Sequence, residues 1–169
     1  NHSSRKWRYF KPNTQYPTHN AHLFQHLKIW QLGDDYTRHC GKYPVIFLTF
    51  KDIKENNWEL CSEKIKSIII DEYRRHNYLL NSQYLDSIDK EYILSIIHKK
   101  ATEADYHRSL KNLTKFLQQH YKEKVVVLID EYDTPVHEAF AGKYYENVID
   151  FLRPFLGAGL KDNVNLQLC

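Results

Sequence analysis

A short apolar run followed by acids constrains the fold of this chain more than any other feature. Residues 125–129 are five consecutive apolar residues, mostly β-branched, and Asp130, Glu131 and Asp133 follow them directly. Such a run predicts a strand buried on both faces, as in a parallel sheet covered by helices. Carboxylates at the carboxyl end of such a strand lie where open α/β sheets bind their ligands.

The rest of the chain alternates strands with helices. Residues 45–50 form a second apolar run, which begins after Pro44 and predicts another buried strand, and a third strand is expected from Leu166. Periodic apolar residues predict helices over about 21–30, 57–75, 89–97 and 103–121, and a last helix from 145 to Gly157 or Gly159. We expect Ser87 or Asp89 to cap the third of these helices and Thr102, with Asp105, the fourth. This alternation predicts an α/β fold with a parallel sheet.

The chain of 169 residues has the length of one domain. Residues 1–20 mix basic, aromatic and proline residues and are expected to form a tail or connection, which leaves 21–169 as the domain. The sequence contains no methionine and begins with Asn1, so we expect it to be a processed product or a piece of a longer protein.

Composition excludes several classes of function. The 24 basic and 21 acidic residues are nearly balanced, so nucleic acid is not indicated as a partner of this segment. No apolar run approaches the roughly 18 residues of a membrane helix, so no membrane partner is expected. Cys40, Cys61 and Cys169 are widely spaced and form no C-x-x-C motif, which indicates a reducing, cytoplasmic setting.

The acids that follow residues 125–129 match the Walker B pattern of nucleotide triphosphatases. In that pattern Asp130 would hold Mg²⁺, and Glu131 would orient or deprotonate a water. The competing interpretation is an acidic turn, because residues 133–135 have turn composition. The companion loop G-x-x-x-x-G-K-[ST] is absent, since Gly41-Lys42 is followed by tyrosine and precedes a strand. The sequence therefore predicts a metal and water half-site without a phosphate cradle.

Charged residues also follow the strand predicted over residues 45–50. If the two strands are parallel, Lys51 and Asp52 emerge at the same edge of the sheet as the acids, and Lys51 would approach a nucleotide phosphate or pair with Asp133. A charged loop is the competing interpretation. Asp52 and Lys54 also match the D-x-K pattern of metal-dependent nucleases, but no aspartate is identifiable on a preceding strand.

Two histidine patterns resemble metal sites but are incomplete. His137-Glu138 begins like H-E-x-x-H, but alanine occupies position 141. His19, His22 and His26 have helical spacing without nearby acid or thiol ligands, so we expect them to be surface histidines.

Several segments together resemble the bacterial AAA-ATPase-like domain proteins. The resemblance covers roughly residues 23–168 and rests on 41–54, 125–135, 143–145, 151–153 and 159–163. It implies a P-loop NTPase fold of the AAA/ASCE-like type, a three-layer α/β/α arrangement. Within it, residues 45–50 would be the second strand, 125–130 the Walker B strand, and the Leu166 strand would lead to a sensor position.

The same resemblance implies site residues and cofactors. Asp130 would be the Mg²⁺-side acid and Glu131 the acid that acts on the catalytic water. ATP and Mg²⁺ would bind once a Walker A segment completes the site. Family members carry that segment N-terminal to the residues seen here, and many carry a nuclease-like domain C-terminal to them. Residues 7–10 resemble the end of the helix that follows the P-loop.

Two hypotheses from different classes follow. The first is a piece of an AAA-like ATPase domain, which is catalytic in the full-length protein. The alternative is a non-catalytic interaction module, or a decayed gene fragment without nucleotide chemistry. A nuclease that uses Asp52 and Lys54 is a third, weaker hypothesis. We also expect unpaired sheet edges to promote self-association.

Overall fold

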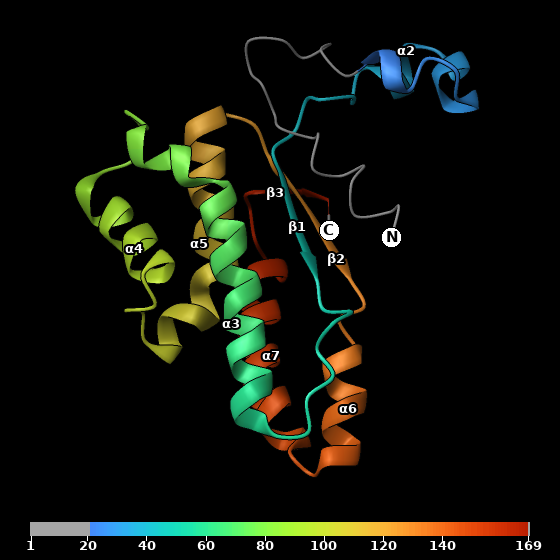
Figure 1. Ribbon diagram of the computed structural model, residues 1–169. Helices are drawn as coiled ribbons and strands as arrows, with labels where there is room; N and C mark the ends of the chain where they lie inside the picture. Colours follow the sequence, from blue (N-terminus) through green and yellow to red (C-terminus); the bar gives the residue numbers. More distant parts are fainter. Residues whose placement is uncertain (1–20, 169) are drawn as a thin grey trace.

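A computed structural model describes residues 21–168 as a mixed α/β fold (Figure 1). In chain order the elements are η2 (Ala21–Leu23), η3 (Lys28–Leu32), α2 (Asp34–Thr37), β1 (Val45–Thr49), α3 (Trp58–Arg75), η4 (Asn77–Asn81), α4 (Ser87–Ile97), α5 (Glu103–Tyr121), β2 (Val125–Asp130), α6 (Thr134–Gly142), α7 (Tyr145–Leu160) and β3 (Leu166–Leu168). The predicted tail over 1–20, with the helix end near 7–10, lies outside the described residues.

The three strands form a parallel sheet in the order β1-β2-β3. β1 and β2 pair in register from Val45 opposite Val126 to Thr49 opposite Asp130. β1 ends one residue earlier than predicted, although the Phe50 amide still donates to the Asp130 carbonyl at 3.0 Å. The predicted parallel sheet is therefore confirmed, with β2 in the middle.

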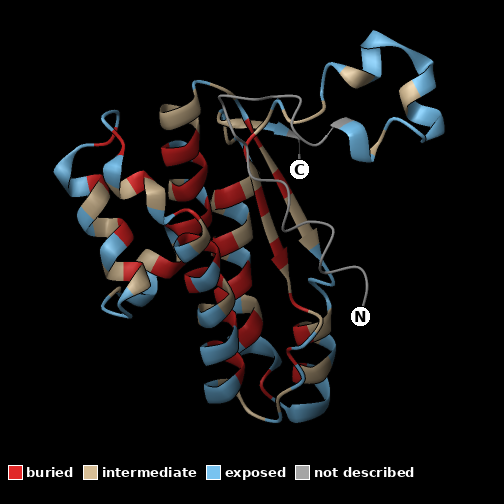
Figure 2. Cartoon of the chain, turned by 45° about the horizontal axis from the view of Figure 1, so that its top comes forward, coloured by how far each residue is buried: buried red, intermediate tan, exposed pale blue. Residues whose placement is uncertain are grey.

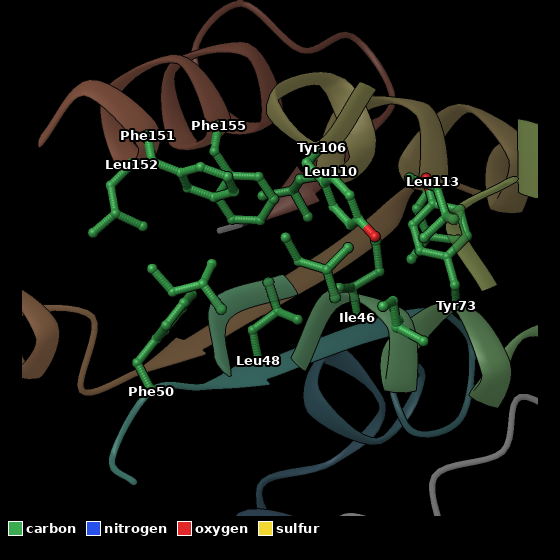
Figure 3. Close-up of a cluster of buried hydrophobic side chains, with 14 of the residues drawn as sticks. Ile46, Leu48, Phe50, Tyr73, Tyr106, Leu110, Leu113, Phe151, Leu152 and Phe155 are labelled. Carbon is green, nitrogen blue, oxygen red and sulfur yellow. The ribbon is translucent and has the colours of Figure 1, made fainter. Parts of the chain in front are cut away.

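Helices α3, α5 and α7 cover one face of the sheet (Figure 1). Figure 3 shows the apolar contact between this face and the helices, formed by Ile46, Leu48, Phe50, Tyr73, Tyr106, Leu110, Leu113, Phe151, Leu152 and Phe155. Burying each large apolar side chain contributes roughly 1.5–3 kcal/mol. This layer is the main stabilising core of the domain (Figure 2).

The prediction that β2 is buried on both faces is wrong. Val125 and Val127 are buried, but Val126 and Leu128 are only half-buried, and β1 shows the same alternation. Side chains of a strand point alternately to the two faces, and the described helices that pack on the sheet cover one of them. The predicted three-layer arrangement remains a prediction.

Three helices begin at capping side chains. The Asn57 side chain accepts a hydrogen bond from the Leu60 amide at the start of α3. Thr102 and Asp105 form the predicted capping box of α5, with both reciprocal bonds present. The predicted cap of α4 is wrong, because Asp86 precedes the helix with extended backbone and accepts from the amide three residues on.

Five segments of the structure differ from what the sequence predicts. The helix expected over 21–30 is replaced by the 3₁₀ segments η2 and η3, and no side chain of residues 22–32 is buried. Two segments without a predicted helix or strand, 33–44 and 79–87, contain the one-turn helix α2 and part of η4. The expected turn at 133–135 is the start of α6, where Pro135 occupies the first turn because its missing N–H is not needed there. Helix α7 runs past both of its glycines to Leu160.

A charged cluster closes the outer edge of β1. The Phe47 amide donates to the Glu72 carboxylate at 3.1 Å, and the Arg75 guanidinium donates to the Val45 carbonyl at 2.6 Å. Glu72 also accepts from Arg75 and contacts His76 Nε2 at 3.2 Å. Burial acts to raise the pKa of Glu72, but hydrogen bonds from His76 and Arg75 outweigh it and lower that pKa. Backbone groups that a neighbouring strand would satisfy are thus satisfied by side chains of α3.

Candidate functional site

The predicted site residues gather where β1 and β2 end, at the edge of the sheet nearest α6 (Figure 1). Asp130 is the last residue of β2 and Thr49 the last residue of β1, and the parallel register places them opposite each other. Lys51 and Asp52 follow β1 in a turn, while Glu131 leads from β2 toward α6. The expectation that both strands deliver polar residues to one edge is confirmed.

The Asp130 carboxylate is exposed, and a hydroxyl holds one of its oxygens. Thr49 Oγ1 donates to Asp130 Oδ2 at 3.1 Å. Within residues 21–168 this is the one hydrogen bond to the Asp130 side chain. The second oxygen, Oδ1, is therefore available to a ligand outside the described protein groups.

Glu131 has an unusual backbone conformation for its residue type. Its φ is +51°, in the left-handed region that non-glycine residues rarely adopt. Its carbonyl accepts from the Thr134 amide at 3.1 Å, and its carboxylate lies 3.4 Å from Thr134 Oγ1. The chain therefore turns sharply at Glu131, and the exposed carboxylate is directed to the α6 side while Asp130 is held from the β1 side.

Asp133 and Lys51 form no ion pair with each other in the described structure. Asp133 precedes α6 without capping it through its side chain, and its Oδ2 lies 4.0 Å from His137 Nδ1. Lys51 is half-buried, and among the described residues no ion pair joins it to Asp133. The predicted ion pair is absent, whereas an approach of Lys51 to a phosphate stays a prediction.

The residues proposed for a nuclease lie in the loop after β1. Asp52 and Lys54 are both exposed. The loop itself is fixed, because Lys64 of α3 donates to the Asp52 carbonyl at 3.2 Å and Tyr144 donates to the Glu55 carbonyl. Nothing in this loop supports the nuclease hypothesis further.

The described side chains fit a Mg²⁺ ion that is shared with a phosphate ligand, and do not fit a metal ion held by protein ligands alone. Among residues 21–168, no group of three or more histidine, cysteine, aspartate or glutamate side chains could hold a metal ion by itself. Mg²⁺ prefers oxygen ligands, retains waters and is commonly held by one or two carboxylates together with substrate phosphates. The free oxygen of Asp130, with Glu131 next to it, fits a shared Mg²⁺ of this kind.

Sequence reasoning missed Thr49. The sequence predicts only that Thr49 lies in the strand over 45–50, because its role depends on which residue of β2 stands opposite it. One sequence signal could have identified Thr49. It is a hydroxyl residue at the end of one strand, where the neighbouring strand ends in an acid.

These features define an α/β protein with a group of exposed acids at the carboxyl end of its middle parallel strand. The chain belongs to the predicted AAA-ATPase family, whose family model matches residues 8–169. No curated protein and no solved structure matches it. Within the described part of the chain, every helix is too short or too polar to cross a membrane.

Proposed function

We propose that this chain supplies the metal-binding and water-activating half of an ATPase site in a P-loop NTPase fold. The observation that carries the proposal is the pair of adjacent exposed acids, Asp130 and Glu131, at the carboxyl end of the middle strand of a parallel sheet. Ligands of open α/β sheets bind at this position. The family match supports the same assignment.

The two acids have different roles in this proposal. Asp130 offers Oδ1 as an oxygen ligand on the metal side. Glu131 lies one residue on, and its carboxylate accepts a proton from the attacking water or orients it. Mg²⁺ bound with ATP would neutralise the phosphate charge that develops during transfer. Phosphate binding itself requires further groups beyond those described, because the sequence has no G-x-x-x-x-G-K-[ST] loop.

The experiment is a pair of isosteric substitutions in the full-length protein. Glu131→Gln keeps the shape and loses the base, so we expect kcat to fall about 10²–10⁴-fold while ATP binding persists. Asp130→Asn should weaken Mg²⁺-dependent ATP binding. Glu146→Gln, an exposed acid in the first turn of α7, is the matched control and should leave both quantities unchanged.

Two outcomes would contradict the proposal in different ways. Parent-like turnover in Glu131→Gln would remove the role of that residue. If the parent full-length protein shows no saturable, Mg²⁺-dependent ATP binding, the alternative of a non-catalytic interaction module is favoured.

A further inference from the structure

We propose that Thr49 is a positioning residue, whose hydroxyl fixes the Asp130 carboxylate so that one oxygen faces the metal. The inference rests on the proposed ATPase function. Thr49 Oγ1 donates to Asp130 Oδ2 at 3.1 Å, although 81 positions separate the two residues in sequence. A carboxylate oxygen that accepts this bond is held in place, and the other oxygen, Oδ1, becomes the ligand.

The backbone makes this arrangement rigid. Thr49 and Asp130 are paired in the β1–β2 register, and the next residue, Phe50, donates its amide to the Asp130 carbonyl at 3.0 Å. Asp130 is therefore tied to β1 through its main chain and its side chain together. Threonine suits the position because its β-branched side chain has few χ1 states, so its hydroxyl direction is well defined.

Buried residues and contacts from Lys64 and Tyr144 hold the loop after β1 in place. Phe50 and Ile53 on either side of the turn are fully buried. Lys64 binds the carbonyl of Asp52, and the Tyr144 hydroxyl binds that of Glu55. Thr49 is consequently attached to a fixed loop and cannot follow Asp130 if that side chain rotates.

Glu131 takes no part in the hydrogen bond between Thr49 and Asp130. Its carboxylate lies on the α6 side, 3.4 Å from the Thr134 hydroxyl. Removal of the Thr49 hydroxyl should therefore change metal binding and leave the water-activating acid in place. This difference between metal affinity and turnover distinguishes a positioning role from a general loss of structure.

The test compares Thr49→Val with Thr49→Ser in the full-length protein. Valine has the same shape without the hydroxyl, whereas serine retains it. Loss of a group that orients a metal ligand lowers metal affinity about 10-fold or more. We expect Thr49→Val to weaken Mn²⁺ binding to the ATP complex by about 10-fold, measured by electron paramagnetic resonance of free Mn²⁺. Thr49→Ser should stay within about 3-fold of the parent, since it keeps the donor.

A second readout uses the Mg²⁺ dependence of hydrolysis. Thr49→Val should raise the Mg²⁺ concentration needed for half-maximal rate by a similar factor and change kcat at saturating Mg²⁺ little. Mn²⁺ affinity unchanged in Thr49→Val, or equal losses in the valine and serine variants, would overturn the inference.

The parent protein and Asp130→Asn separate this inference from the proposed function. If Mn²⁺–ATP binding in the parent does not depend on Asp130, the proposed function fails and the role of Thr49 fails with it. If binding depends on Asp130 but is unaffected by Thr49→Val, only the role of Thr49 is wrong.

Discussion

Two glycines of α7 offer a direct test of how closely α5 and α7 pack. A Cβ built on Gly159 would lie 2.5 Å from Leu110 Cδ2 and 2.9 Å from Leu110 Cβ. The second atom is attached to the α5 backbone, so rotation of the leucine cannot relieve the overlap and the helices must move apart. A Cβ on Gly157, half a turn earlier, would meet nothing within 4 Å.

The magnitudes follow from two opposed effects. Replacing a helix-interior glycine by alanine stabilises a helix by about 1 kcal/mol. Overpacking a filled interior costs about 1–3 kcal/mol. Gly157→Ala should therefore raise the free energy of unfolding by about 1 kcal/mol. Gly159→Ala has the same helix gain but also the packing penalty. Its free energy of unfolding should therefore be about 1–3 kcal/mol below that of Gly157→Ala.

Urea unfolding followed by tryptophan fluorescence measures the difference. Trp58 of α3 packs against Phe151 of α7, with ring centroids 6.1 Å apart, and reports on this helix layer. Circular dichroism should give the same midpoints if unfolding is two-state. If Gly159→Ala stabilises the chain as much as Gly157→Ala, the close approach of α5 and α7 is refuted.

Three further outcomes are expected. Glu131→Gly relieves the left-handed backbone and should stabilise the chain by about 1 kcal/mol in thermal melts, whereas Glu131→Gln should not. Glu72→Ala removes the buried carboxylate that accepts from the Phe47 amide and pairs with Arg75, and should destabilise by about 3–5 kcal/mol, with Phe47 amide exchange accelerated and Glu63→Ala as the exposed control. Burial lowers the pKa of His76 in the folded state, and the pKa of Glu72 is also lowered, so the unfolded chain binds more protons. Stability should thus be full above about pH 6.5 and fall as the pH drops below it; a urea midpoint that is constant from pH 7.5 to 5 would refute this.

The parts of the fold that the sequence predicted are those set by local patterns. The apolar runs of β1 and β2 predicted the strands, and the helices between them indicated a crossover to a parallel strand. Thr102 with Asp105 marked the start of α5 through their spacing alone. The positions of Asp130 and Glu131 followed because acids after a buried strand emerge at its carboxyl end.

The features that sequence reasoning missed depend on contacts between distant residues. The role of Thr49 requires the β1–β2 register, which periodicity does not reveal. The contacts of Glu72 at the edge of β1 arise from the approach of α3 to the strand, which helical periodicity does not reveal. The left-handed backbone of Glu131 has no signal in its residue type, since glycine or asparagine would be expected there.

The pairing of Thr49 with Asp130 also has a consequence for biosynthesis. The 81 positions between them correspond to about 4–16 s of translation at 5–20 residues per second. During that interval β1 has left the ribosome without its partner strand, while the residues of α3 that close its outer edge follow within the next 30 positions. Asp130 is therefore synthesised well after Thr49, and the hydrogen bond between them cannot form before the two strands have paired.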